Sequence, residues 1–394
     1  MKRRLSPAAL LVFATLAIPA PVYFSIRPDR SELAKSLNPP RQSPSINTAT
    51  AAALNPANGF SRSPNTPQTQ DNRLSEALAA LRAKGTNPVD TRKILLDLRA
   101  YLGSLPPSEA SGVIIHFLAQ GSLDADTGLG FGIGPNGFLK DHPSLRVALT
   151  DWLGQIDIKA AGILAEQILT SPTSADEWSV CLRNYARSKP TSDRFDFLRT
   201  KTEQLIRNPA WRYSPTVGYF EAFDVLVYSK STQSTSLLAE LVSDRTPAGR
   251  AVAHAAFLTL DRLVLEEPAE MFRQFATLPE LTRARGPMVA NMMARADLRD
   301  AGQRDLARNY LLDPNRSQQE LEGFADAYPN ANRSLSQNLL TGNKSPNPSD
   351  LITHDRAALN VVDGWSKEPA FRKILPHLET MRNRLATFVG QVEK

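Results

Sequence analysis

The chain has 394 residues, of which 42% are hydrophobic and 22% are charged, and its formal net charge is +6. Of this charge, +5 lies in residues 1–72, so the rest of the chain carries only +1. A nearly neutral body lacks the basic face that nucleic-acid recognition requires, and we therefore expect no nucleic-acid partner. The single cysteine, Cys181, excludes a framework of intramolecular disulfides.

The first 26 residues are typical of an export signal. Lys2, Arg3 and Arg4 precede an uncharged, largely apolar stretch over residues 5–26. This stretch is long enough to span a bilayer as a helix, whereas Ala20 provides the small residue that a signal peptidase needs. Two outcomes stay open: a membrane anchor through residues 5–26, or a cleaved signal peptide. In both, we expect the body in the periplasm of a bacterial cell envelope, either anchored in the inner membrane or released.

Residues 27–72 are predicted to form a disordered linker. Residues 36–72 contain six prolines and one aromatic residue, and the remainder is rich in Ser, Thr, Asn and Gln. Such a composition cannot bury enough apolar surface to offset the entropy of ordering the chain.

From Arg73 onward, apolar residues recur at the spacing of amphipathic helices, as in Ile94, Leu95, Leu98 and Leu102. After the Gly-rich segment, the expected helices are 144–155, 157–170, 174–188, 191–207, 216–228, 233–243, 248–265, 268–276, 287–298, 300–312, 317–327, 333–341, 354–366 and 368–390. No window alternates with a period of two residues, so the predicted fold class is all-α.

Short loops containing proline separate these helices, and short loops make consecutive helices pack as antiparallel neighbours. We expect an irregular α-solenoid of antiparallel, HEAT-like helix pairs, with separate small bundles as the alternative. Residues 73–312 form the predicted helical-repeat domain, which includes a Gly-rich loop over 121–143. A polar, loosely structured connection follows over 313–352, and residues 353–394 form a C-terminal helical cap.

One stretch resembles a known group of proteins. The run Gly-Pro-Asn-Gly-Phe-Leu over 134–139 and the run over 143–157, which contains Asp151-Trp-Leu-Gly, are similar to uncharacterised exported helical proteins of environmental bacteria. The resemblance implies a shared architecture and no particular activity.

The Gly-rich loop contains five glycines within residues 127–138 and matches the pattern G-x-G-x-x-G over 132–137. A dinucleotide site needs a strand before this pattern and a helix that begins inside it, but Pro135 interrupts it. We therefore expect no cofactor. The loop is either an ordered connector or a partner-binding loop, and in the second case Phe131 and Asn136 are its candidate contact residues.

No motif for metal binding or catalysis is present. The five histidines are scattered without H-E-x-x-H spacing, and neither a G-x-S-x-G elbow nor the Glu-Ser pair of lytic transglycosylases occurs. We expect no metal site. A glycosidase that uses two carboxylates stays open, because the many acidic residues offer many pairs.

Aromatic residues concentrate between residues 211 and 223. Trp211, Arg212, Tyr213 and Tyr219 are the candidate partner-binding residues, because exposed aromatic and arginine side chains dominate protein interfaces. The alternative is that they form the core of a junction between helices.

Export, helical repeats and the missing catalytic motifs together predict an interaction scaffold that binds another envelope protein. The alternative is a hydrolase or lyase that processes peptidoglycan with a carboxylate site outside the known motifs. A purely structural envelope component is a third possibility.

Overall fold

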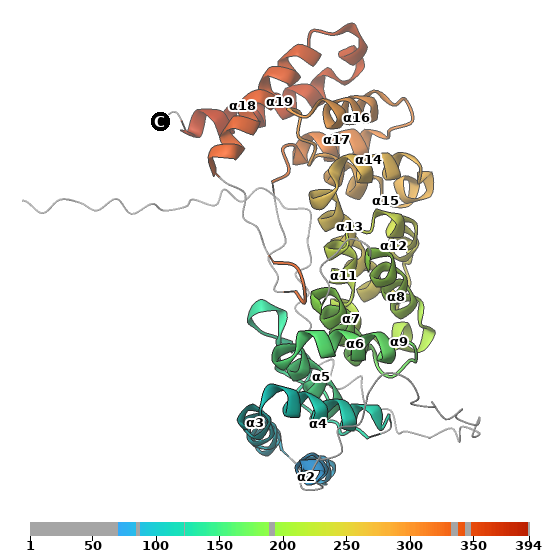
Figure 1. The fold of residues 1–394 in the computed structure, drawn as a ribbon. Helices are drawn as coiled ribbons and strands as arrows, with labels where there is room; N and C mark the ends of the chain where they lie inside the picture. The colour runs from blue at the N-terminus through green and yellow to red at the C-terminus, as the bar shows by residue number, and fades with distance from the viewer. Residues whose placement is uncertain are drawn as a thin grey trace, which may run out of the picture. The chain divides into compact units, whose positions relative to one another are not determined.

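The computed structural model describes residues 70–83, 87–121, 123–188, 194–331, 338–342 and 348–392. These residues are predominantly helical, as the sequence predicts (Figure 1). The predicted export segment and most of the predicted linker lie outside the described residues. Among the residues described, no helix is both long and apolar enough to span a membrane.

The first part of the fold is built from helices whose ends follow local sequence signals. Its helices are α2 (Gln70–Arg82), α3 (Pro88–Ser104), α4 (Pro107–Ala119), α5 (Leu145–Ile156), α6 (Ile158–Ile168) and α7 (Ala175–Ser188). The side chains of Asn87, Ser144 and Asp157 accept hydrogen bonds from the first backbone N–H groups of α3, α5 and α6. Leu98, Leu149 and other apolar residues of α2 to α6 share one buried cluster.

The Gly-rich loop contains a small antiparallel hairpin, which the sequence does not predict. Its parts are β1 (Gly132–Ile133), η1 (Pro135–Gly137) and β2 (Leu139–Asp141). Asn136 and Gly137 both have positive φ angles, so the turn depends on residues that tolerate the left-handed region. Two strands this short lie below the length at which alternation becomes visible in a sequence.

The middle of the fold contains the predicted helices, some of them divided into shorter pieces, and one short helix, Pro209–Tyr213, that the sequence does not predict. They are α8 (Phe195–Arg207), α9 (Pro209–Tyr213), α10 (Val217–Glu221), α11 (Phe223–Tyr228), η3 (Thr232–Ser234), α12 (Thr235–Ser243), α13 (Arg250–Glu266) and α14 (Pro268–Ala276). Their apolar faces belong to the largest buried cluster, together with those of the following helices.

The last part comprises α15 (Pro279–Met293), α16 (Ala301–Leu312), α17 (Gln318–Ala327), α18 (Pro348–Trp365), η4 (Pro369–Ile374) and α19 (Leu375–Val392). The predicted start of the helix at 287 is wrong, because α15 begins at Pro279 and contains Pro287 in its interior. Arg285 leaves the helical region, with φ −143° and ψ 34°, so the helix accommodates the proline with a kink.

Most helices pack against others that are one to three places away in the chain, as α6 does on α7, α12 on α13, and α11 on α13 (Figure 1). Residues 338–342, which we call the docked segment, are different. The sequence predicts a helix over 333–341, but the docked segment is not helical. It contacts residues of the hairpin, α7, α11 and α13 that precede it by a long stretch of chain.

Candidate functional site

The aromatic residues predicted to bind a partner are divided between the core and the surface. Tyr219 is completely buried, and its hydroxyl donates a hydrogen bond to the carbonyl oxygen of Ile206 at 2.9 Å. Burial raises the pKa of Tyr219 to about 12, so its hydroxyl stays protonated. Trp211 is partly buried, and its ring lies edge-on to that of Trp178 with 5.3 Å between centroids. These two residues therefore contribute to packing.

Tyr213, by contrast, is 88% exposed at the end of α9. Its neighbour Arg212 forms an ion pair with Asp244, with Nη2 and Oδ2 3.2 Å apart. Because Asp244 also lines a surface pocket, Arg212 connects the predicted residues to a concave site that the sequence does not reveal.

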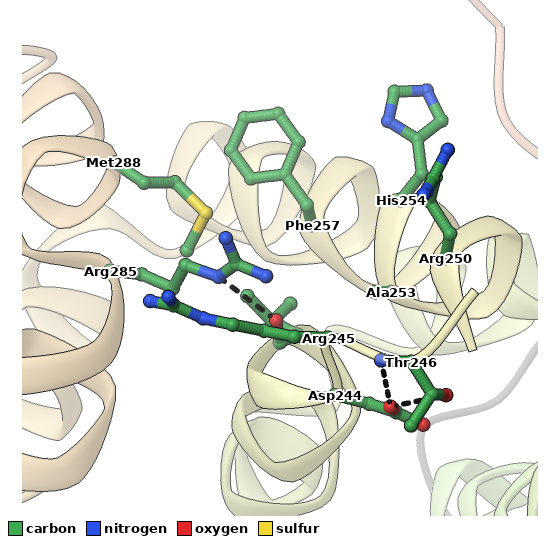
Figure 2. A pocket seen from close by; sticks show the side chains of 10 residues that line it. Asp244, Arg245, Thr246, Arg250, Ala253, His254, Phe257, Arg285 and Met288 are labelled. Atoms are coloured by element: carbon green, nitrogen blue, oxygen red, sulfur yellow. Dashed lines mark hydrogen bonds between the residues drawn. The ribbon is translucent and has the colours of Figure 1, made fainter. Parts of the chain in front are cut away.

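This pocket has a volume of about 450 Å³ and lies between the end of α12, the first two turns of α13 and the kinked part of α15 (Figure 2). Its lining residues are Val242, Asp244, Arg245, Thr246, Arg250, Ala253, His254, Phe257, Arg285 and Met288. Three arginines and one histidine thus face a space that contains a single carboxylate. We call this site the basic pocket.

Hydrogen bonds to backbone carbonyls hold two of the arginines in place. Arg285 Nε donates to the carbonyl oxygen of Val242 at 3.1 Å, at the end of α12 (Figure 2). Arg245 Nη2 donates in the opposite direction, to the carbonyl oxygen of Ala284 at 2.9 Å. The two guanidinium groups therefore bridge the gap between α12 and α15 from both sides, which positions them before a ligand arrives.

Arg250 and His254 lie one turn apart on α13, and both side chains are exposed. The charge of Asp244 is paired with Arg212, which does not line the pocket, and its Oδ1 accepts hydrogen bonds from Thr246 N at 2.9 Å and from the Thr246 hydroxyl at 2.7 Å. These bonds, with Arg212, lower the pKa of Asp244 and occupy its oxygens. The basic pocket therefore presents an excess of positive charge to solvent.

The apolar part of the lining consists of Ala253 and Phe257 of α13, the helix that also carries Arg250 and His254, and of Met288 of α15 (Figure 2). A site with guanidinium groups beside an aromatic ring and a thioether fits a ligand that has a carboxylate or other anion next to an apolar group. The lining holds neither a pair of carboxylates nor a cysteine.

The two predicted residues of the Gly-rich loop lie elsewhere. Phe131 is buried in a small apolar cluster that includes Leu339 of the docked segment. The carbonyl oxygen of Asn136 accepts a hydrogen bond from Arg187 Nη2. The structure therefore separates the predicted partner-binding residues into two regions, and the Gly-rich loop belongs to the region of the docked segment.

Sequence reasoning missed the three arginines of the basic pocket. Arg245 and Arg250 flank the start of α13, but such residues are common around helix ends. Arg285 follows much later in the chain, and only the packing of α15 against α12 brings it to the others. Among the described residues, no group of three His, Cys, Asp or Glu side chains is arranged to hold a metal ion.

No protein-family model matches the chain, and comparisons with curated proteins and with solved structures gave no significant match.

Proposed function

We propose that this protein is an exported or membrane-tethered helical-repeat protein of the bacterial envelope, and that it acts as an interaction scaffold for another envelope protein. Residues 1–26 are the basis for the location, since their basic start and apolar run are those of an export signal. The helices are proposed to form an irregular α-solenoid of HEAT-like pairs. Packing between helices that are close in the chain supports this arrangement.

The observation that carries the proposed function is the basic pocket. Arg245 and Arg285 donate to backbone carbonyls, the one carboxylate of the pocket is already engaged, and part of the lining is apolar. A protein segment with an acidic side chain or a C-terminal carboxylate next to an aromatic or aliphatic residue fits both halves of the pocket. Tyr213 is exposed and follows Arg212, whose ion pair with Asp244 reaches the pocket lining, and on this basis Tyr213 is proposed to belong to the same binding surface.

The test is site-specific photo-crosslinking in the host cell. A crosslinking amino acid at Tyr213 is expected to capture one recurrent envelope protein, whereas the same group at Val89, which is 74% exposed on α3, is not. Arg250→Glu should abolish the Tyr213 crosslink, because it reverses the charge of an exposed pocket residue. Arg283→Glu is the matched control, since Arg283 is an exposed arginine of α15 that does not line the pocket.

Binding must then be reproduced with the purified partner. Loss of affinity in Arg250→Glu but not in Arg283→Glu supports the proposal, and so does weaker binding at higher salt. Equal capture at Tyr213 and Val89, or a crosslink that Arg250→Glu leaves unchanged, contradicts it. Whether the leader anchors the protein is decided by the N-terminal residue of the envelope-bound form.

A second candidate function, a peptidoglycan hydrolase or lyase, is favoured by one observation. Burial and the nearby negative charge of Asp224 raise the pKa of Glu221 to about 7, against the opposing charge of Arg262. A carboxyl group with a pKa near 7 suits a general acid. However, both oxygens of Asp224, the adjacent carboxylate, are engaged by Arg262 and by the docked segment. Release of soluble glycan from purified peptidoglycan by the wild type but not by Glu221→Gln would establish this function in place of the scaffold.

A further inference from the structure

The docked segment is held on its N–H side by one buried carboxylate. Asp224 is 2% exposed, and its Oδ2 accepts the backbone N–H groups of Leu340 at 2.7 Å and Thr341 at 3.0 Å. Its Oδ1 accepts the hydroxyl of Thr341. Arg262 Nη2 donates to the same oxygen at 2.5 Å and also to the Thr341 hydroxyl. A single side chain of α11 thus binds two successive amides and a neighbouring hydroxyl.

The carbonyl side of the segment is held by α7. Arg187 Nη2 donates to the carbonyl oxygen of Leu339 at 2.8 Å and to that of Asn136 in the hairpin. Burial and the charge of Arg183 lower the pKa of Arg187 to about 10, so it stays cationic at neutral pH. Gly137 lies against the same carbonyl, where a Cβ atom would collide with it. The hairpin is therefore shaped for the close approach of a backbone.

Between these polar contacts, the side chain of Leu339 enters an apolar socket. It is completely buried among residues of the Gly-rich loop, α5 and α7, namely Phe131, Leu139, Val147 and Val180. Leu340, the next residue, packs against the edge of the same cluster. The site thus contacts three successive residues in different ways. It buries the apolar side chain of Leu339, packs against the apolar side chain of Leu340 and binds the hydroxyl of Thr341.

These contacts are unlike the rest of the fold. The hydrogen bonds from the docked segment reach residues 116 and 152 positions earlier in the chain, whereas the helices pack mainly on near neighbours. Charged side chains on helices bind its backbone, and a socket takes one of its side chains. This is how folded domains recognise extended peptides.

We propose that the surface formed by Arg187, Asp224, Arg262 and the Leu339 socket is a peptide-binding site that the docked segment occupies as an internal ligand. An extended segment of a partner protein, with the order apolar–apolar–threonine or serine, binds there when it displaces residues 339–341. The site shares no residue with the basic pocket, so it does not depend on the function proposed above.

The docked segment and an external peptide compete for the same site, and the docked segment has the advantage of being covalently connected to it. A tethered ligand acts at an effective concentration on the order of millimolar, so it occupies its own site for most of the time. An external peptide therefore binds with an affinity reduced by the fraction of molecules in which the site is empty. Removal of the internal ligand raises the affinity for the same peptide.

The experiment uses a fluorescein-labelled peptide with the sequence of residues 336–344 and measures its polarisation with the full-length protein. Leu339→Asp places a charge in the apolar socket and should release the docked segment. We expect this variant to bind the peptide saturably and at least ten-fold more tightly than the wild type does. Adding Asp224→Asn should remove the binding, and so should the Leu339→Asp change in the peptide itself.

Circular dichroism verifies that each variant retains the helical content of the wild type. If Leu339→Asp does not fold, Thr341→Val takes its place. It removes only the hydroxyl contacts of residue 341, which are with Asn338, Asp224 and Arg262, and it should also increase peptide affinity. Equal peptide binding by the wild type and a folded, segment-releasing variant overturns the proposal. A concentration-dependent dimer of the wild type that Asp224→Asn dissociates also overturns it, since a second copy would then be the occupant.

Discussion

Asp151 of α5 and Arg183 of α7 form an ion pair that is completely buried, with 2.5 Å between Oδ1 and Nη1. Arg183 also donates to the carbonyl oxygen of Gly137, and Asp151 accepts the backbone N–H of Leu139, so the pair fixes the end of the hairpin turn and the start of β2 to the helices. Burial alone would raise the pKa of Asp151, but the hydrogen bond with His142 and the charge of Arg183 outweigh it and hold this pKa below its ordinary value.

A second ion pair joins the same two helices, but here the cation belongs to α5 and the anion to α7. Arg146 of α5 donates through Nε at 3.0 Å and Nη2 at 2.7 Å to Oε1 of Glu177 of α7. Both side chains are nearly inaccessible to solvent. Because each helix contributes one cation and one anion, α5 and α7 can pair in only one register. The socket for Leu339 takes Val147 from α5 and Val180 from α7, and the two ion pairs therefore help to fix where these residues lie.

Asp151→Ala should destabilise the protein strongly. It leaves the guanidinium of Arg183 buried without a counter-charge, and such losses cost about 3–5 kcal/mol in the free energy of unfolding. Urea unfolding followed by circular dichroism measures the change. Glu76→Ala is the control, since Glu76 belongs to an exposed pair with Arg73 and should cost less than about 1 kcal/mol. A loss of similar size in both variants would contradict the role of the buried pair.

Gly154→Ala tests the close packing of α5 on α7. A Cβ atom at residue 154 would collide with the side-chain amide of Asn184, which accepts hydrogen bonds from Arg183 and donates one to the carbonyl of Thr150. We expect a loss of about 1–3 kcal/mol, as for other overpacked cores. Gly103→Ala is the matched change, because residue 103 of α3 has open space around it.

The two alanine substitutions should change the free energy of unfolding differently, because Gly154→Ala should lower it and Gly103→Ala should not. At Gly103 the substitution only improves helix propensity, and the expected effect ranges from neutral to about 1 kcal/mol of stabilisation. Thermal unfolding of both variants beside the wild type provides the comparison. If Gly154→Ala is as stable as Gly103→Ala, then α5 and α7 are further apart than described.

Cys181 is predicted to be chemically inert in the folded protein. Its side chain is fully buried on α7, and burial, together with the charge of Glu177, raises the pKa of the thiol well above its ordinary value. Only the thiolate reacts rapidly with maleimides or aromatic disulfides. Native protein should react on the order of 100-fold more slowly than protein in urea. Tyr213→Cys, at an exposed position, should gain one rapidly reacting thiol, and rapid labelling of Cys181 in the native wild type would refute its burial.

The sequence predicts the helices well where local signals mark their ends. The helix predicted over 268–276 is α14 with the same bounds, because Pro268 suits a first helical turn. The prediction failed at α15, where Pro287 was interpreted as a helix start although the chain kinks at Arg285 and continues. In both cases the local signal is a proline, and only the packing of the flanking residues distinguishes a helix start from a kink.

The candidate sites are less accessible to sequence reasoning, because they depend on contacts between distant residues. The predicted helix over 333–341 has suitable apolar spacing, but the backbone N–H groups of Leu340 and Thr341 bond to Asp224 rather than within a helix. A carboxylate located 116 residues earlier leaves no trace in the local pattern. Phe131 and Asn136, the contact residues proposed in the Gly-rich loop, both lie at the docked segment, and their binding of a partner stays a prediction.

Glu221 should make the stability of the protein depend on pH near neutrality. Burial and the charge of Asp224 raise its pKa from its ordinary value of 4.5 to about 7, while Arg262 acts in the opposite direction. The folded state therefore holds a proton that the unfolded state releases between pH 4.5 and 7. Stability from this group is fully present below about pH 4.5 and is lost as the pH rises through 7.

Glu221→Gln stays neutral at every pH and isolates this contribution. The variant and the wild type should unfold at similar urea concentrations near pH 4, whereas at pH 8 the variant should be more stable by about 2–3 kcal/mol. Glu166→Gln, a change at an exposed position of α6, reports the effect of losing one surface charge. Because Glu221 lies beside Asp224, the carboxylate that binds the docked segment, ionisation of Glu221 adds a second negative charge, which the charge of Arg262 opposes. A difference between Glu221→Gln and the wild type that is constant from pH 4 to pH 8 would mean that Glu221 is as well solvated in the folded protein as in the unfolded chain.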